Sequence, residues 1–328
     1  MAPEKRPERS PESIRAAGQL STRDLAHALG VSESSVKRWA DGGVLRVVRT
    51  VGGHRRIPLA EAVRFVRESR ATLVQPAALG LARASATARG TGADADHDQL
   101  AAWLAAGSVA EARGFLNALY LRGRSVAVIV DGPLRAAMQR VGERWLHEPD
   151  GILVEHRATD ICIQWLSQLR AVLAPGDDAP VALGGAPAGD PYVLPSLAVA
   201  AALEAEGLRA VNLGPETPIP TLLLALERER PAIVWVSAST EPARDALVHG
   251  LEPLAAAARA RGARLILGGR ALEATPLDVP ADVHVARSMG EVAAFAQGLR
   301  AGRAGGASRR SQTGRRRAAS RTRTGTLA

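Results

Sequence analysis

The segment GDPYVLP, residues 189–195, combines a carboxylate, a phenol and two prolines directly after an apolar stretch. Asp190 can accept hydrogen bonds, and the Tyr192 hydroxyl can accept or donate them. The prolines fix the backbone φ and stiffen the loop. Open α/β sheets bind ligands beyond the carboxyl ends of their strands, so this loop is a candidate ligand-binding segment. A loop tyrosine without a chemical role is the alternative interpretation of Tyr192.

A second group of reactive side chains lies upstream. Trp145 is followed after nine residues by Glu155 and His156, with a helix break at Pro149-Asp150-Gly151 between them. Such a break lets an aromatic face, a carboxylate and an imidazole converge at one surface of a helical bundle. Each residue alone has a simpler interpretation: Trp145 as bundle core and the Glu-His pair as a solvated helix start.

A third group is basic and lies near the N-terminus. Ser32 is expected to cap a helix through about Ala40, and an arginine-rich hairpin with Gly52-Gly53 at its tip follows that helix. The exposed side chains suit the major groove and the flanking phosphates of double-stranded DNA. The candidate DNA-binding residues are Ser34, Ser35, Lys37, Arg38, Arg49, His54, Arg55 and Arg56.

The distribution of charge agrees with a nucleic-acid-binding domain joined to other domains. Residues 19–70 carry 10 basic and 5 acidic side chains, residues 71–299 carry 19 and 25, and residues 300–328 carry 9 arginines and no acid. A basic block next to a slightly acidic one indicates separate functions for the two. The arginine-rich tail is either an electrostatic tether to DNA or a solvated end without a role.

The chain divides into three ordered blocks. Residues 19–70 are predicted to form a winged helix-turn-helix, in which Gly30 makes the sharp turn. Residues 95–175 are predicted to form a four-helix bundle. In residues 178–300, five apolar strands alternate with helices, which predicts a doubly wound parallel sheet of flavodoxin-like type. Residues 1–18 and 301–328 are expected to be disordered, and residues 71–94 to be a linker.

The first block resembles the DNA-binding domain of MerR-type regulators. The resemblance rests on SVKRWADGGVLRVVRTVGGHRRI, which is similar to that family's recognition helix, wing and T-x-GGHRR sequence. It spans about residues 19–70 and implies operator binding, with a dimer or higher oligomer as the binding species.

The remaining blocks resemble the cobalamin-binding module of B12 enzymes and sensors. That family has D/E-x-H-x-x-G, then S-x-L about forty residues on, then G-G, and it buries the nucleotide tail of cobalamin near the Ser and the glycines. Here the corresponding residues are Asp190, Ser237 and Gly268-Gly269. The W-x9-EH pattern of Trp145, Glu155 and His156 resembles the bundle that covers the upper cobalamin face in the light-sensing CarH/LitR group of MerR-like regulators.

The chain departs from the pattern at the loop that holds cobalt in the family. Tyr192 stands at the position of the cobalt-ligating histidine, Pro195 at the glycine, and Ser239 at the leucine of S-x-L. A phenol with a pKa near 10 is a poor cobalt ligand unless it ionises. Three outcomes remain open: cobalamin, in particular adenosylcobalamin, bound without the lower histidine; another tetrapyrrole or small effector; or a ligand-free dimerisation platform.

We therefore expect a DNA-binding transcription regulator whose B12-type module controls oligomerisation and operator binding. A corrinoid-dependent enzyme subunit is the rival class, but no block is left over for a catalytic domain. A pure interaction protein is disfavoured by the basic winged helix. Cys162 is the single cysteine, and no apolar run suits a signal peptide or a membrane span, so a cytoplasmic location without a membrane partner is expected.

Overall fold

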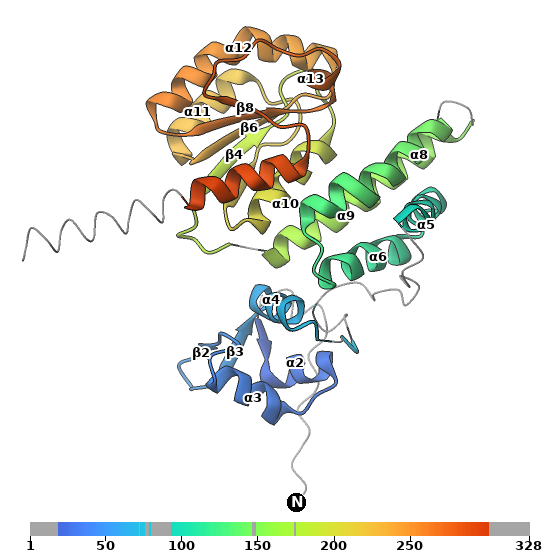
Figure 1. The fold of residues 1–328 in the computed structure, drawn as a ribbon, viewed down its shortest axis with the longest axis vertical. Coiled ribbons are helices and arrows are strands. Elements are labelled where there is room, and N and C mark those ends of the chain that lie inside the picture. The colour runs from blue at the N-terminus through green and yellow to red at the C-terminus, as the bar shows by residue number, and fades with distance from the viewer. Residues whose placement is uncertain are drawn as a thin grey trace, which may run out of the picture.

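The computed structural model describes residues 19–71, 73–75, 79, 93–145, 149–173 and 175–301, with only the backbone of residues 93–95, 144 and 145. The segments expected to be disordered, 1–18 and nearly all of 301–328, lie outside the described residues, as does most of the expected linker. Three units follow one another along the long axis: a winged helix, a helical bundle and an α/β domain (Figure 1).

The winged helix is built on a three-stranded antiparallel sheet of order β1-β3-β2. β1 (Gln19–Ser21) leads into α2 (Thr22–Leu29) and α3 (Glu33–Asp41). β2 (Val48–Arg49) and β3 (Arg55–Pro58) form the wing, and α4 (Leu59–Ser69) follows. The hairpin was predicted from the sequence but β1 was not.

The bundle contains α5 (Ala93–Ala106), α6 (Val109–Leu121), α8 (Arg135–Trp145) and α9 (Gly151–Leu173). A short α7 (Val126–Ile129) and a π-helical turn η2 (Val130–Leu134) precede α8. The predicted four-helix bundle did not include this interruption. Pro133 lies inside the π turn, and because proline has no N–H to donate, the regular hydrogen-bond ladder is interrupted there.

The α/β domain has a five-stranded parallel sheet of order β5-β4-β6-β7-β8. Its strands are β4 (Val181–Gly185), β5 (Arg209–Asn212), β6 (Ile233–Ser237), β7 (Arg264–Gly268) and β8 (Val283–Val285). Order 2-1-3-4-5 is that of flavodoxin-like folds. β5 lies on one side of β4, and β6, β7 and β8 follow on the other side, so the strand order switches between β4 and β6. A ligand is therefore expected beyond the carboxyl ends of β4 and β6.

Helices cover both faces of this sheet. α11 (Ile219–Glu229) and α12 (Glu241–Ala260) pack on Val234 and Val236. α10 (Val193–Ala205) and a helix over 289–301 pack on the other face, against Ile233 and Trp235. Successive residues of a strand point to opposite faces, which explains the division of β6 between two cores. A short α13 (Arg270–Ala274) follows β7.

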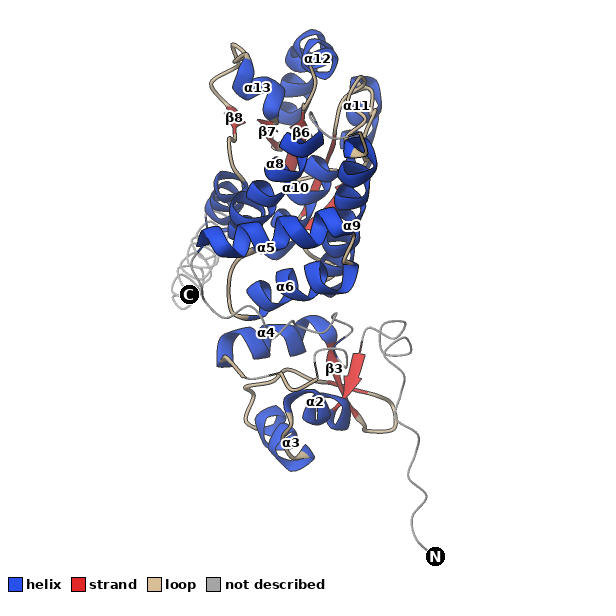
Figure 2. Ribbon diagram, turned by 90° about the vertical axis from the view of Figure 1, so that its right-hand side faces the viewer, coloured by secondary structure: helices blue, strands red, loops and turns tan. Residues whose placement is uncertain are grey.

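One apolar core runs from the winged helix through the bundle to α10. It contains Leu20 and Ile57 of the wing sheet, Phe115 and Trp165 of the bundle, and Leu197 of α10. Both views place α4 against the α6 side of the bundle (Figures 1 and 2). The predicted fold class, a winged helix-turn-helix, a helical bundle and a doubly wound five-stranded sheet, is confirmed. No helix in the described residues is long and apolar enough to cross a membrane.

Candidate nucleic-acid interface and candidate cobalamin site

Local capping sets the angle between α2 and α3. The Ser21 hydroxyl accepts from the backbone N–H of Asp24, and the Asp24 carboxylate accepts from Ser21 N. Gly30 ends α2 with φ +66°, and the Ser32 hydroxyl caps α3 through Ser35 N. These caps satisfy the free backbone donors at each helix start and hold α3 on the surface.

α2, α3 and the wing enclose a basic hollow of about 380 Å³. It unites five of the predicted DNA-binding residues, but Ser34, Ser35 and Arg38 lie elsewhere on α3. The lining residues are Ser21, Thr22, Arg23, Glu33, Lys37, Arg49, Gly53, His54, Arg55 and Arg56. A concave, mainly cationic surface beside an exposed helix suits a phosphate backbone.

Two of the cations are held by carboxylates of α3. The Lys37 ammonium lies 3.0 Å from Glu33, and the Arg55 guanidinium lies 2.5 Å from Asp41. A hydrogen bond from Thr22 and the neighbouring Lys37 lower the pKa of Glu33. Glu33 is therefore ionised at neutral pH and positions Lys37.

The wing arginines differ in their freedom to meet phosphate. Within the described residues, Arg49 and Arg56 form no ion pair, whereas Arg55 joins the wing to α3 through Asp41. Arg49 and Arg55 are direct cross-strand partners in β2 and β3. Arg55 is thus a positioning residue for the wing, and Arg49 and Arg56 present uncompensated charge.

Thr22 and Arg23 belong to this surface but were missed from the sequence. Thr22 donates to the Glu33 carboxylate at 2.7 Å across the helix-turn-helix. A basic residue in the first turn after a helix cap is the signal that could have indicated Arg23. The Thr22–Glu33 contact depends on the packing of α2 on α3, which no local pattern shows.

The candidate ligand residues of the α/β domain meet at the carboxyl edge of its sheet. Asp190 is fully buried, and its two carboxylate oxygens accept from Tyr192 N at 3.1 Å and Ser239 N at 2.6 Å. Asp190 thereby holds the loop after β4 against the loop after β6. Both oxygens have protein partners, so the structure gives Asp190 a role in joining loops.

Ser237 and the two glycines close the adjacent part of this edge. Ser237 is buried and in register with Gly268. A Cβ on Gly268 would lie 2.9 Å from the Ala286 carbonyl oxygen. A Cβ on Gly269 (φ +111°) would lie 2.2 Å from the Ala238 carbonyl oxygen. The glycines are required by close backbone packing of the protein itself.

Tyr192 lies at the outer rim of the same edge. Its side chain is 46% exposed, and the guanidinium of Arg270 lies 6.0 Å from its ring centroid. Cations at this distance interact weakly with aromatic faces. Tyr192 also precedes α10 as its cap residue, without a side-chain hydrogen bond to the helix.

The bundle residues lie at the start of α9 and end of α8. The Glu155 carboxylate accepts from the Thr159 hydroxyl at 2.8 Å and lies 3.7 Å from His156 Nε2. The His156 side chain is 75% exposed. The side chain of Trp145 lies outside the described part, so its approach to Glu155 and His156 stays a prediction. Among the described residues, no hydrogen bond or ion pair joins this group to the loop of Asp190.

The α/β domain fits the lower side of a histidine-ligated cobalamin poorly. Tyr192, which the resemblance places at the histidine position, carries a phenol and is exposed. Glu155 and the exposed imidazole of His156 are compatible with contacts to a corrinoid edge.

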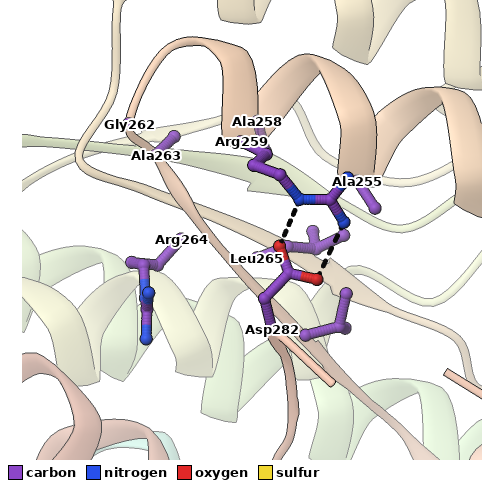
Figure 3. A pocket seen from close by; sticks show the side chains of 9 residues that line it. Ala255, Ala258, Arg259, Gly262, Ala263, Arg264, Leu265 and Asp282 are labelled. Atoms are coloured by element: carbon purple, nitrogen blue, oxygen red, sulfur yellow. Dashed lines mark hydrogen bonds and ion pairs between the residues drawn. The ribbon is translucent and has the colours of Figure 1, made fainter. Parts of the chain in front are cut away.

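A second hollow, of about 120 Å³, lies away from this edge, at the start of β7 (Figure 3). Arg259 and Asp282 close it with two hydrogen bonds of 2.8 and 2.9 Å. Because the pair is satisfied and exposed, it stabilises the end of α12 without offering a free charge.

Two domain families match the chain. Residues 20–70 match a helix-turn-helix domain, and residues 97–170 match a B12 binding domain. The chain carries a helix-turn-helix domain followed by a B12 binding domain. The matches support DNA binding, transcription regulation and cobalamin binding. No curated protein matches the chain.

Solved structures of three corrinoid-related proteins are weakly similar to this chain. A monomethylamine corrinoid protein of Methanosarcina barkeri has 16% identity and a TM-score of 0.48, covering 63% of this chain and 100% of that one. A cobalamin-binding protein of Desulfitobacterium hafniense has 16% identity and a TM-score of 0.32, over 62% and 98%. A methanol:cobalamin methyltransferase complex of M. barkeri has 17% identity and a TM-score of 0.32, over 64% and 81%.

Proposed function

We propose that this protein is a transcription regulator that binds operator DNA through its winged helix and changes its assembly state through the bundle and α/β domain. The observation that carries the proposal is the basic hollow between α3 and the wing, in which Arg49 and Arg56 have no ion-pair partner within the described residues. Cations of this kind bind the phosphates that flank a recognition helix.

Oligomerisation is expected because the DNA-binding winged helix is small. One winged helix makes few DNA contacts, so a symmetric oligomer on a repeated site is the expected binding species. The winged helix packs directly on the bundle through α4. A change of packing in the bundle is therefore transmitted to the DNA-binding unit.

The test begins with selection of a binding sequence from a random duplex library by the full-length protein. A double variant, Arg49→Gln with Arg56→Gln, should lose binding to the selected site at least about tenfold. Arg228→Gln with Arg264→Gln removes the same charge from exposed positions of the α/β domain and should leave binding unchanged. Equal binding by the two double variants would refute the proposed DNA interface.

The sensor role has its own test. The purified protein is incubated in the dark with adenosylcobalamin, desalted, and examined by absorption and gel filtration before and after green light. A retained corrinoid spectrum with a light-dependent change in size supports light sensing through Trp145, Glu155 and His156. A colourless protein with unchanged size and intact DNA binding supports the alternative, a ligand-free dimerisation platform.

A further inference from the structure

The central strand of the α/β domain carries a tryptophan on the face that α10 covers. Trp235 lies on β6, two residues before Ser237, so both side chains belong to the same face of the sheet. Its side chain is 1% exposed and packs with Val199 and Leu203 of α10. The space between the middle of the sheet and α10 is therefore filled by an indole.

The neighbouring strand is adapted to this indole. Gly184 of β4 is in register with Trp235. A Cβ at Gly184 would lie 2.3 Å from the indole Cδ2 and 2.2 Å from the Trp235 carbonyl oxygen. The room left by the missing side chain of Gly184 is thus already taken by protein.

Hydrogen bonds hold the indole in place. Its Nε1–H donates to the Ser196 hydroxyl at 3.1 Å, and that hydroxyl donates to the Asn212 side-chain oxygen at 2.8 Å. Ser196 lies in the first turn of α10 and is fully buried. Rotating the indole out would leave a buried hydroxyl without its donor and open a cavity, and both changes are costly.

We infer that this module does not take the nucleotide tail of a cobalamin between its sheet and α10, because Trp235 occupies that space. A corrinoid held by the chain would then be held by the bundle residues and the rim around Tyr192, and its tail would stay outside the space between the sheet and α10. The inference rests on the B12-type module of the proposed function, but it concerns ligand geometry alone.

The test compares cobalamin with cobinamide, a corrinoid that lacks the nucleotide tail, by equilibrium dialysis and absorption spectra of the full-length protein. Equal affinities within about threefold, or binding of neither, support the inference. Burying an aromatic tail would favour cobalamin by at least about tenfold. Such a preference, together with a spectrum in which the tail base has left cobalt, overturns it.

Two variants distinguish the effect of the Trp235 side chain on the space between the sheet and α10 from its effect on folding. Trp235→Phe keeps a ring in the space and should bind the two corrinoids as the wild type does. Trp235→Ala empties the space. It should create a preference for cobalamin over cobinamide if the carboxyl edge of the sheet can hold the corrin ring. Should Trp235→Ala fail to fold, the wild-type comparison decides alone. DNA binding by the wild type is measured in parallel, so failure of the inference and failure of the regulator proposal are distinguished.

Discussion

The guanidinium of Arg67 lies 3.8 Å above the ring of Tyr120 and donates to the carbonyl oxygen of the same residue at 2.6 Å. It also donates to the Arg124 carbonyl oxygen at 3.1 Å. Arg67 belongs to α4 of the winged helix and Tyr120 to α6 of the bundle. The Arg67 side chain, in the last turn of α4, therefore joins the DNA-binding unit to the bundle.

Arg67→Gln should loosen that junction. Loss of the stacking and of charge-assisted hydrogen bonds at a partly exposed site is expected to lower the free energy of unfolding by about 1 kcal/mol. Urea unfolding, with limited proteolysis between α4 and α6, measures the effect. Arg70→Gln changes an exposed arginine three residues on and serves as the control. Identical behaviour of the two variants would show that the contact does not join the units.

Two of the three wing arginines, Arg49 and Arg55, should differ in the salt dependence of DNA binding. Arg49→Gln is expected to reduce the slope of log affinity against log salt by about 0.9, the value for one phosphate contact. Arg55→Gln should change the slope less, because Asp41 already compensates its charge. Fluorescence anisotropy across a salt series measures both slopes. Equal slope changes would show that Arg55 contacts phosphate directly.

Glu61 of α4 should give the winged helix an acid-sensitive step. The carboxylate is buried and accepts from Arg46 N and Arg64 Nε, each at 2.8 Å. Burial alone would raise its pKa, but the hydrogen bonds from Arg64 and Arg46 outweigh burial and lower it. The stabilisation is therefore fully present above the unfolded pKa of about 4.3 and is lost as pH falls through the lower folded pKa.

Glu61→Gln is expected to cost about 1.5–3 kcal/mol at pH 7. The difference from the wild type should shrink between pH 5 and pH 3, each about one unit from the unfolded pKa. Urea unfolding at several pH values measures it. Glu68→Gln removes an exposed partner of Arg64 and should cost less than about 1 kcal/mol at every pH. A Glu61→Gln cost that does not vary with pH would contradict the assignment.

Cys162 should be inert in the folded protein. The thiol is fully buried in the bundle, and burial raises its pKa to about 12. Only the thiolate reacts with iodoacetamide, so labelling at pH 8 is expected in denaturant and absent without it. Mass spectrometry reads the single site. Rapid labelling of the native protein would mean that the bundle core opens under native conditions.

Much of the fold could be read from local patterns. The cap at Ser32 and the turn at Gly30 were visible as residue types in fixed positions. The five strands were visible as apolar runs between helices. β1, α13 and the π turn were missed, because none of them stands out as an apolar run between helices.

The candidate site was predicted less completely. The sequence placed Asp190, Ser237 and Gly268 at one sheet edge, since carboxyl ends of parallel strands share an edge. It did not show that Asp190 is bound to Ser239 N. That contact spans 49 residues and depends on β4 and β6 being neighbours, which only the strand order decides.

The sequence by itself determined the order of the three units and the basic character of the first. Those properties follow from residue type, spacing and charge along the chain. Only the tertiary structure decided that Asp41 compensates Arg55 and that Trp235 fills the space beside Gly184. The period of a strand tells which face a side chain takes, but the room on that face depends on the partner strand and covering helix.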